Sequence, residues 1–413
     1  MWETFRSVAR FDTFETDSTR RRLKRVASVD DLRRLARRRL PGGVFDYIDG
    51  GAEDERTLAS NEGDFARLEF RPRVLRDVSA LDTSTTILGR RASMPIILSP
   101  TGFTRIAHSE GELAVTRAAA RAGIPWSLST MGTRSIEACA DANPHGSKWF
   151  QVYAWKDRGL VRELVERAAA SGYDALWLTV DTAVLGRRER DVRRGMTLPP
   201  KLGPGTLVDG ALHPAWTWDF LRAEPITFAN VVGRHEQDGT TAISLAEHVA
   251  SQFDQALSWD DVTWLRSLWD GPIALKGIQT VADAERAVAE GVDAIGLSNH
   301  GGRQLDDAPS PVRLVEPVRQ ALGDGPTIIC DGGVRRGSDV VKALALGADA
   351  VALGRPYFLA LGAAGEAGVD WLLGFLREGL ERTMALTGCT SLADVERGLV
   401  AWRDVGAPAN GDR

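Results

Sequence analysis

The sequence predicts an α/β fold, namely a (β/α)8 TIM barrel with an N-terminal helical extension and a long insertion between the fourth and fifth strands. Short apolar runs alternate with amphipathic segments rich in Ala and Arg, which is the pattern of βαβ units around a parallel sheet. There are eight such runs, and eight is the strand number of this barrel. In chain order the expected strands cover residues 95–99, 126–129, 149–153, 175–180, 272–276, 294–298, 327–330 and 350–353.

Polar or glycine residues follow every expected strand. Barrel enzymes build their active sites from the loops at the carboxyl ends of the strands, whereas a purely structural barrel has no need to concentrate polar residues there. The pattern therefore predicts an enzyme with its site at that face. The residues are, in strand order, Pro100, Thr101 and Gly102; Thr130; Gln151 and Tyr153; Thr179 and Asp181; Lys276; Asn299 and His300; Asp331, Gly332 and Gly333; Gly354 and Arg355.

The chain is expected to have three parts. Residues 1–90 form a basic arm and a helical cap that contributes to the active site, residues 91–392 form the barrel, and residues 393–413 form a C-terminal tail. The insertion, at about residues 191–271, is rich in Pro, Trp and Phe, and a loop of this length is usually functional. It could be a lid, a membrane contact or a subunit contact. Its histidines, His213, His235 and His248, lack the spacing of metal ligands, so we expect no metal site.

Charge is distributed unevenly over the chain. The net charge is -5, but the first 40 residues hold 12 basic and 6 acidic side chains, so the arm carries +6 and the remainder -11. An acidic body argues against a nucleic-acid partner. The basic runs at residues 20–25 and 37–39 suit either a solvated helix face or attraction to an anionic membrane surface.

Cysteine usage and hydropathy indicate the compartment. The three cysteines, Cys139, Cys330 and Cys389, are far apart and odd in number, which fits reduced thiols. The sequence contains neither an apolar signal region near Met1 nor a run of 18 uncharged apolar residues. We therefore expect a cytoplasmic protein, with peripheral contact to the inner face of the cell membrane as an option.

The most informative motif is SNHGGRQLD at residues 298–306, which begins at the end of the sixth expected strand. His300 titrates near neutrality and can accept a proton, while Arg303 presents a planar charged fork that matches a carboxylate. A base beside a carboxylate clamp predicts a small organic acid that loses a proton.

Glycine-rich segments after the last two strands predict a phosphate site. Residues 331–337, DGGVRRG, and the pair Gly354 and Arg355 lie where barrels bind phosphate, and glycine N–H groups with arginine side chains hold such anions. The alternative is a pair of glycine turns with surface arginines.

Two other nucleotide-binding motifs are disfavoured. No G-x-G-x-x-G motif follows a first strand, which argues against a Rossmann dehydrogenase. The P-loop motif does not match because Ser338 and Asp339 stand where it requires Lys and then Ser or Thr.

In combination these motifs resemble one family, the FMN-dependent L-2-hydroxy acid oxidases and dehydrogenases. The insertion segments HPAWTWDF and LSWDDVTWLRSLWDGP look most like those of bacterial quinone-linked L-lactate dehydrogenases. The resemblance covers about residues 40–392 and depends on motifs in this order: PTGF at Pro100, LST at Leu128, WFQVY at Trp149, LTVDT at Leu178, ALKGI at Ala274, SNHGGRQLD at Ser298, DGGVRRG at Asp331 and LGRP at Leu353.

The resemblance implies a role for each matching residue. His300 is implied as the active-site base, Asp181 as its carboxylate partner, and Lys276 as the neighbour of the flavin N1 and C2 carbonyl. Phe103, Met131 and Leu185 match the positions around the substrate side chain. The implied substrate ligands are Tyr47, Tyr153, Arg188 and Arg303; besides Lys276, the implied cofactor ligands are Pro100, Thr101, Gly102, Ser129, Gln151, Thr179, Ser298, Asp331, Gly332, Gly333, Arg335, Gly354 and Arg355.

The implied reaction is FMN-dependent oxidation of a small L-2-hydroxy acid. L-lactate, giving pyruvate, leads over mandelate and longer acids, and quinone or a cytochrome leads as electron acceptor. The first alternative is a lactate, glycolate or mandelate oxidase that reduces oxygen to hydrogen peroxide. An isopentenyl-diphosphate isomerase-like flavoenzyme would not need Arg188 and Arg303, and a non-catalytic binding barrel would more readily have lost Lys276, His300 or Tyr153. The family also implies a homo-oligomer, most simply a tetramer.

Overall fold

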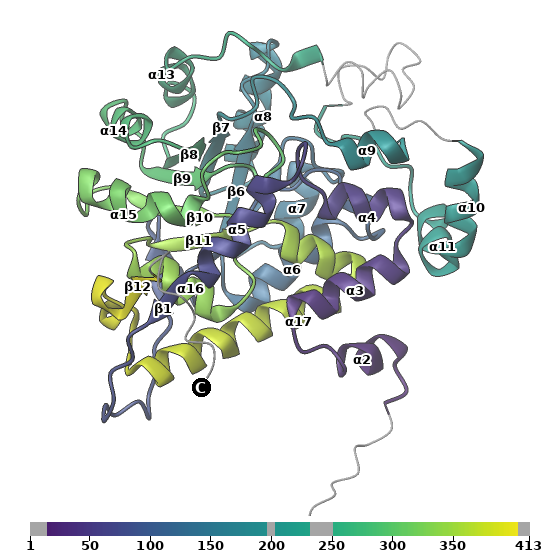
Figure 1. Ribbon diagram of the computed structural model, residues 1–413. Helices are drawn as coiled ribbons and strands as arrows, with labels where there is room; N and C mark the ends of the chain where they lie inside the picture. The colour runs from purple at the N-terminus through teal and green to yellow at the C-terminus, as the bar shows by residue number, and fades with distance from the viewer. Residues whose placement is uncertain (1–14, 196–202, 232–250, 404–413) are drawn as a thin grey trace, which may run out of the picture.

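A closed barrel of eight parallel strands forms the centre of the molecule (Figure 1). The computed structural model describes residues 15–195, 203–231 and 251–403, so parts of the expected arm, insertion and tail lie outside the described residues. The strands follow one another round the barrel in chain order, which confirms the expected (β/α)8 fold. They are β4 (Ile96–Leu98), β5 (Trp126–Ser129), β6 (Lys148–Val152), β7 (Ala175–Thr179), β8 (Ile273–Ile278), β9 (Ala294–Ser298), β10 (Thr327–Asp331) and β11 (Ala350–Leu353).

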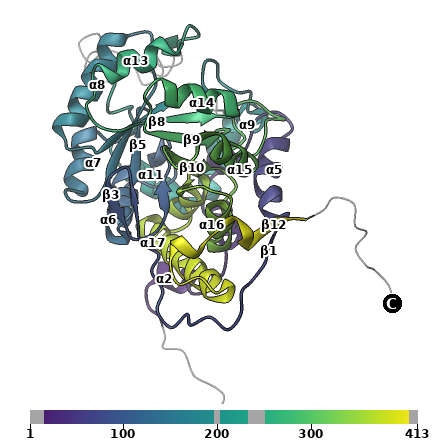
Figure 2. The same ribbon diagram turned by 90° about the vertical axis from the view of Figure 1, so that its left-hand side faces the viewer.

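Helices follow the strands and cover the outside of the barrel. In α8 (Arg158–Ala170) the buried residues Leu160, Leu164 and Ala168 recur every four positions, and Asp157 caps the helix by accepting from the N–H of Leu160. In the turned view, strands β8, β9 and β10 lie between helices on either side (Figure 2). The other surrounding helices are α6 (Glu112–Ala122), α7 (Ile136–Ala142), α14 (Val281–Ala289), α15 (Pro311–Leu322), α16 (Gly337–Ala345) and α17 (Arg355–Thr387).

The longest helix, α17, is long and apolar enough to span a membrane but belongs to the core. It has 33 residues, and 61% of its most apolar window is buried inside the protein. Its path bends at Ala364 and Gly365, where the backbone angles are not helical, and a Cβ on Gly365 would stand 2.7 Å from Nε2 of His108. The helix packs along α3 (Val29–Arg39), α6 and α16.

The N-terminal section contacts both ends of the barrel. Helix α4 (Gly42–Asp49) lies at the carboxyl ends of the strands, where Tyr47 and Ile48 line the pocket described below. The hairpin of β2 (Thr85–Ile87) and β3 (Arg90–Ala92) packs Ile87 and Ala92 against residues of the barrel interior. Strand β1 (Leu68–Phe70) pairs with β12 (Val400–Trp402), so residues 400–402 are tied to this section. The section also contains α2 (Ser18–Leu23) and α5 (Arg56–Ala66), and short 3-10 helices cover Thr104–Ile106, Leu392–Asp394 and Arg397–Leu399.

The insertion between β7 and β8 docks on the barrel through α11 (Pro214–Arg222). Trp216 donates its indole N–H to the carbonyl of Ile106 at 2.7 Å, and the carboxylate of Asp219 accepts from the N–H and hydroxyl of Ser109. In the described part of the insertion the other helices are α9 (Glu189–Arg194), α10 (Pro204–Leu212) and α13 (Asp260–Arg266). His235 and His248 lie outside the described residues.

Strand register gathers polar side chains from different strands into one layer. Residues that pair in register project to the same side of a sheet, here into the carboxyl end of the barrel interior. Three registered pairs are polar on both strands, which is why the expected site residues converge although they are far apart in the sequence. The pairs are Ser129 with Gln151, Thr179 with Lys276, and Ser298 with Asp331.

Candidate active site

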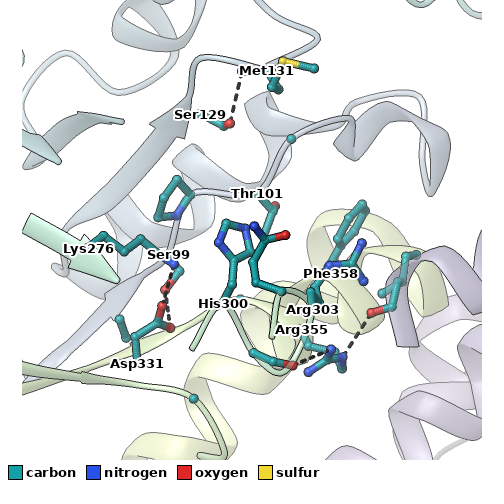
Figure 3. A pocket seen from close by; sticks show the side chains of 18 of the residues that line it. Ser99, Thr101, Ser129, Met131, Lys276, His300, Arg303, Asp331, Arg355 and Phe358 are labelled. Atoms are coloured by element: carbon teal, nitrogen blue, oxygen red, sulfur yellow. Dashed lines mark hydrogen bonds and ion pairs between the residues drawn. The ribbon is translucent and has the colours of Figure 1, made fainter. Parts of the chain in front are cut away.

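A pocket opens at the carboxyl ends of the barrel strands (Figure 3). Its wall combines strand ends with residues of α4 and of the insertion. Most of the residues predicted from the sequence line it, namely Tyr47, Pro100, Thr101, Gly102, Ser129, Tyr153, Arg188, Lys276, His300, Arg303, Asp331, Gly332, Gly333, Arg335, Gly354 and Arg355. The remaining predicted residues, Gln151, Thr179, Asp181 and Ser298, lie behind this wall and are hydrogen-bonded there.

The turn after β9 brings the imidazole of His300 into the pocket. His300 has a φ of 58°, and Gly301 and Gly302 follow with φ of 66° and 73°. Successive left-handed angles reverse the chain tightly; glycine adopts them freely, whereas a histidine does so with strain. The hydroxyl of Ser298 accepts from the backbone N–H of His300 at 3.1 Å and holds the turn.

The carboxylate of Asp181 faces Nδ1 of His300. Burial alone would raise the pKa of Asp181, but the charge and hydrogen bond of His300 and the charge of Lys276 outweigh it, so this pKa falls below its ordinary value. A carboxylate can only accept, so Nδ1 carries the proton and Nε2 keeps its lone pair. Burial lowers the pKa of His300 despite the opposing charge of Asp181. The imidazole is therefore neutral at pH 7 and can act as a base.

Two arginines, Arg188 and Arg303, make cation–π contacts with the ring of Tyr47. The guanidinium carbon of Arg303 lies 5.1 Å from the ring centroid and that of Arg188 lies 5.8 Å from it. Arg303 also donates to the carbonyl oxygens of Tyr47 at 2.6 Å and Gly50 at 3.1 Å. Burial, together with the like charge of Arg188, lowers the pKa of Arg303 to about 10, so the side chain stays charged at pH 7. The pair is suited to orient a carboxylate.

Tyr153 presents a phenol from the end of β6. Its ring stacks on Trp155 with centroids 6.3 Å apart and meets Phe253 edge-on at 5.1 Å. Burial raises the pKa of Tyr153 well above its ordinary value. The hydroxyl therefore stays protonated and can donate a hydrogen bond to an anionic ligand.

A buried ion pair joins β8 to β10. The Nζ atom of Lys276 lies 3.1 Å from Oδ2 of Asp331 and donates to the hydroxyl of Ser298 at 3.1 Å. Asp331 accepts from the hydroxyl of Ser99 at 2.9 Å (Figure 3). It also accepts from the hydroxyl of Ser298 at 2.9 Å. Burial alone would lower the pKa of Lys276, but the charges of Asp331 and Asp181 raise it above its ordinary value. The ammonium therefore remains charged beside the pocket.

Three neighbouring strand ends are linked by a chain of neutral hydrogen bonds. The hydroxyl of Ser129 donates to Oε1 of Gln151 at 3.0 Å, and Nε2 of Gln151 donates to the hydroxyl of Thr179 at 3.0 Å. Each group satisfies the next, which fixes the orientation of all three. Ser129 is the member that faces the pocket.

Glycines after β10 let the backbone line the pocket closely. Gly332 and Gly333 have φ of 137° and 85°, in the region that favours glycine. A Cβ on Gly333 would stand 2.0 Å from the carbonyl oxygen of Asn61, so a larger residue has no room.

Two arginines stand near this glycine loop. Arg355 opens α17 and donates to the carbonyls of Ile48, Gly50 and Gly301. Burial lowers the pKa of Arg355 to about 9, so it is still charged at pH 7. Arg335 donates to Glu62 at 2.7 Å. Two cations, flexible glycines and a helix N-terminus together form a site for an anionic group.

Several lining residues were not predicted from the sequence. Phe228 and Phe253 come from the insertion, and Phe358 comes from α17. Gln304 also lines the pocket, and its Nε2 donates to the carbonyl of Asp181 at 2.7 Å. Its place in the RQLD segment was the one available signal, whereas nothing local indicated which Phe residues of a long insertion would fold back over the barrel.

Three comparisons place this geometry among known proteins. A family model described as FMN-dependent dehydrogenase matches residues 36–402. A Mycobacterium tuberculosis protein named "Putative L-lactate dehydrogenase" is 46% identical over 94% of this chain and 92% of its own length. A protein of Spinacia oleracea named glycolate oxidase is 43% identical over 91% of this chain and 96% of its own. The crystal structure of a monotopic membrane protein, (S)-mandelate dehydrogenase, superimposes with a TM-score of 0.87 at 40% identity, covering 92% of this chain and all of that one.

Proposed function

The chain belongs to the family of FMN-dependent dehydrogenases, and from this premise we propose that it oxidises L-lactate to pyruvate and passes the electrons to quinone or a cytochrome. That it is an FMN-dependent enzyme of 2-hydroxy acid oxidation follows from the family. The observation that carries the proposal is the meeting of a neutral base, His300, with the charged pair Arg188 and Arg303 in one pocket.

The residues of the pocket fit FMN. Arg335, Arg355 and the loop of Gly332 and Gly333 form a cationic, glycine-rich end that suits a phosphate. Ser129 supplies a polar group at the strand ends, and the charged Lys276 stands where an anion formed on a flavin ring could be offset. Bound FMN would supply the two-electron acceptor of the reaction.

The chain itself orients the substrate and removes a proton. Arg188 and Arg303 would hold the carboxylate, and the protonated Tyr153 would donate a hydrogen bond to the substrate. Nε2 of His300 would take a proton from the substrate. The charge of Asp181 would then stabilise the imidazolium, because the Asp181 carboxylate already faces Nδ1.

The pocket lining around the expected position of the substrate side chain is apolar, which favours a substrate with an apolar side chain. Phe103, Met131, Leu185, Phe228 and Phe253 all line the pocket. An apolar lining rewards a methyl or aryl group, whereas glycolate has no side chain to bury. Mandelate is therefore the second candidate, since aromatic rings in the wall can pack against a phenyl group.

An apolar rim supports an apolar electron acceptor. Val184, Leu185 and Leu305 are exposed, and Leu185 also lines the pocket. The carbonyl of Val184 accepts from the side chain of Gln304, so the segments that carry these residues lie side by side. A quinone ring could bury itself against them, whereas oxygen, the acceptor of the alternative oxidase, would gain nothing from such a surface.

Exposed apolar side chains on α10 and α11 support contact with the inner face of the cell membrane. An ion pair between Arg39 of α3 and Asp219 of α11, 3.7 Å apart, joins this surface to the basic helices. Anionic lipid attracts each nearby cation by about 1 kcal/mol, so basic and apolar groups would act together. The exposed apolar groups are Leu207, Val208, Leu212, Trp218 and Leu221, and the exposed basic groups of α2 and α3 are Arg20, Arg21, Arg22, Arg37 and Arg38.

Flotation with lipid vesicles tests this contact. We expect binding to anionic vesicles, reduced by salt and by Leu221→Ser, and no binding to zwitterionic ones. If the protein binds neither kind of vesicle but sediments as a tetramer, the apolar surface is instead a contact with another copy of the chain.

Anaerobic reduction of the yellow protein tests the proposed reaction. We expect L-lactate to bleach the flavin band and D-lactate to leave it unchanged, and then fast reoxidation by a soluble quinone and slow reoxidation by oxygen. Fast recovery with oxygen would make the protein an oxidase. Bleaching by (S)-mandelate alone would move the assignment to the second candidate.

A further inference from the structure

The short helix α9 begins directly after Arg188 and carries a buried carboxylate, Asp191. Arg188 is the residue that precedes the helix, and Asp191 follows one turn later. Oδ2 of Asp191 lies 3.5 Å from Nε of Arg188, and Asp191 is only 6% exposed. A buried acid therefore faces one of the two arginines that the proposed function assigns to the substrate carboxylate.

Ion pairs of Arg190, which lies between Arg188 and Asp191 in the sequence, hold α9 in place. Arg190 donates to Oδ2 of Asp49 in α4 at 2.9 Å, and it also pairs with Glu55. Asp49 in turn accepts from Arg33 at 2.5 and 2.7 Å. This network joins α9 to α4, which carries Tyr47, so α9 as a whole cannot shift relative to α4 without breaking a set of partly buried ion pairs.

Positive charges exceed negative ones among the groups around Asp191. Arg188 and Arg303 are like charges that both lie near the ring of Tyr47, and the charge of Asp191 partly offsets both. The charged groups that face Asp191 are Arg188, Arg303, Arg190 and Asp46. Burial raises the pKa of Asp191 although the arginines act in the opposite direction. Its negative charge is therefore held at some cost, close to where a substrate carboxylate would bind.

We propose that Asp191 is a positioning residue that pairs with Arg188 between turnovers and thereby weakens the hold of the arginine pair on carboxylates. This inference rests on the proposed function of Arg188 and Arg303 as carboxylate ligands. A 2-hydroxy acid and its 2-oxo product carry the same carboxylate, so a pocket with two uncompensated arginines would bind the product as tightly as the substrate. Asp191 competes for Arg188 and so allows the product to leave.

The test is carboxylate binding by the holoenzyme, which needs no turnover. Oxalate and pyruvate are titrated into the wild-type protein and into Asp191→Asn, and binding is followed by the change in the flavin absorbance. We expect the substitution to lower both dissociation constants by about tenfold or more, because a counter-charge beside the arginines is removed. In turnover, KM should fall, and kcat should fall wherever product release limits it.

Glu189→Gln is the matched control, since Glu189 lies on the same helix and pairs with the exposed Arg193. It should leave both dissociation constants unchanged. Unchanged or weaker binding in Asp191→Asn overturns the inference, because a merely structural aspartate would leave Arg188 misplaced when removed. Asp191→Ser repeats the comparison with a smaller uncharged group. Wild-type protein that binds neither carboxylate would defeat the proposed function itself.

The pH dependence gives a second readout. As pH falls toward the raised pKa of Asp191, protonation removes its charge, so the wild-type dissociation constant for pyruvate should approach that of Asp191→Asn. His300 titrates in both proteins, so its contribution is common to the two curves. A gap between the curves that stays constant with pH contradicts the competition of Asp191 for Arg188.

Discussion

Nδ1 of His300 lies 3.0 Å from Oδ1 of Asp181, whose side chain is only 3% exposed. This contact leaves Nε2 free to act as the base. We expect His300→Ala to lower kcat by about 100- to 10,000-fold, the usual contribution of a positioned base. Steady-state rates at equal FMN content measure the effect. His145→Ala, at an exposed histidine, should be neutral, and wild-type turnover of His300→Ala would end the assignment.

The same pair predicts how the rate depends on pH. Because the base must be neutral, kcat/KM should rise as pH increases through the pKa of His300, which burial places below its ordinary value. Asp181 raises this pKa by favouring the imidazolium. Asp181→Asn should therefore move the inflection to lower pH and reduce the plateau. A profile whose inflection moves upward, measured from pH 5 to 9, contradicts this assignment.

Arg303→Ala should weaken substrate affinity and rate together. The substitution leaves the substrate carboxylate without one of its two cations in a buried site, which costs about 2–5 kcal/mol. The loss is measured as kcat/KM for L-lactate. Arg303→Lys keeps the charge but not the planar fork and should be intermediate. Unchanged constants in Arg303→Ala would refute its role.

Lys276→Met should destabilise the fold and change the flavin. It leaves Asp331 without its cation in a buried site, so we expect the free energy of unfolding to fall by about 3–5 kcal/mol. The loss of a positive charge beside the pocket should also lower the reduction potential of bound FMN. Urea unfolding and a redox titration measure the two effects. A potential that Lys276→Met leaves unchanged argues against contact with the flavin, and Lys276→Arg should retain most of both properties.

Two glycine substitutions should have opposite effects on stability. Gly333→Ala introduces a Cβ 2.0 Å from the carbonyl of Asn61 at a φ of 85°, so it should lower the free energy of unfolding by more than about 1 kcal/mol and weaken FMN retention. Gly374→Ala, in α17 with nothing within 4 Å, should raise it by about 0.5–1 kcal/mol. Thermal unfolding distinguishes the two. Equal stabilities would contradict the close packing of the glycine loop.

The barrel strands were predictable because a strand buried on both faces reads as a continuous apolar run. Three of them, β5, β9 and β11, have the bounds expected from the sequence. The other five differ from the expected bounds by one or two residues at an end. The largest difference is in β8, which continues to Ile278, beyond the expected end at Lys276; Gly277 adopts a φ of 112° there, and the pairing with β9 shifts. The polar side chain of Lys276 marked the end of the apolar run in the sequence, whereas pairing with the neighbouring strand extends β8 as far as Ile278.

The proximity of some site residues could be predicted from the sequence, whereas that of others could not. His300 and Arg303 are three positions apart after one strand, so their proximity was a local matter. The link between Lys276 and Asp331, and the chain from Ser129 to Thr179, depend on the register of neighbouring strands. Phe228, Phe253 and the network of Asp49 with Arg190 were not foreseen at all.

The sequence by itself determined the barrel, the face that carries the site and the residue types gathered there, because strand periodicity and strand-end chemistry are encoded locally. Only the tertiary structure decided which residues face the pocket and which support them from behind, as Asp181 and Gln151 do. It also placed Asp191 against Arg188 and brought aromatic side chains of the insertion into the wall. These contacts depend on register, burial and the docking of helices, which are properties of the folded chain as a whole.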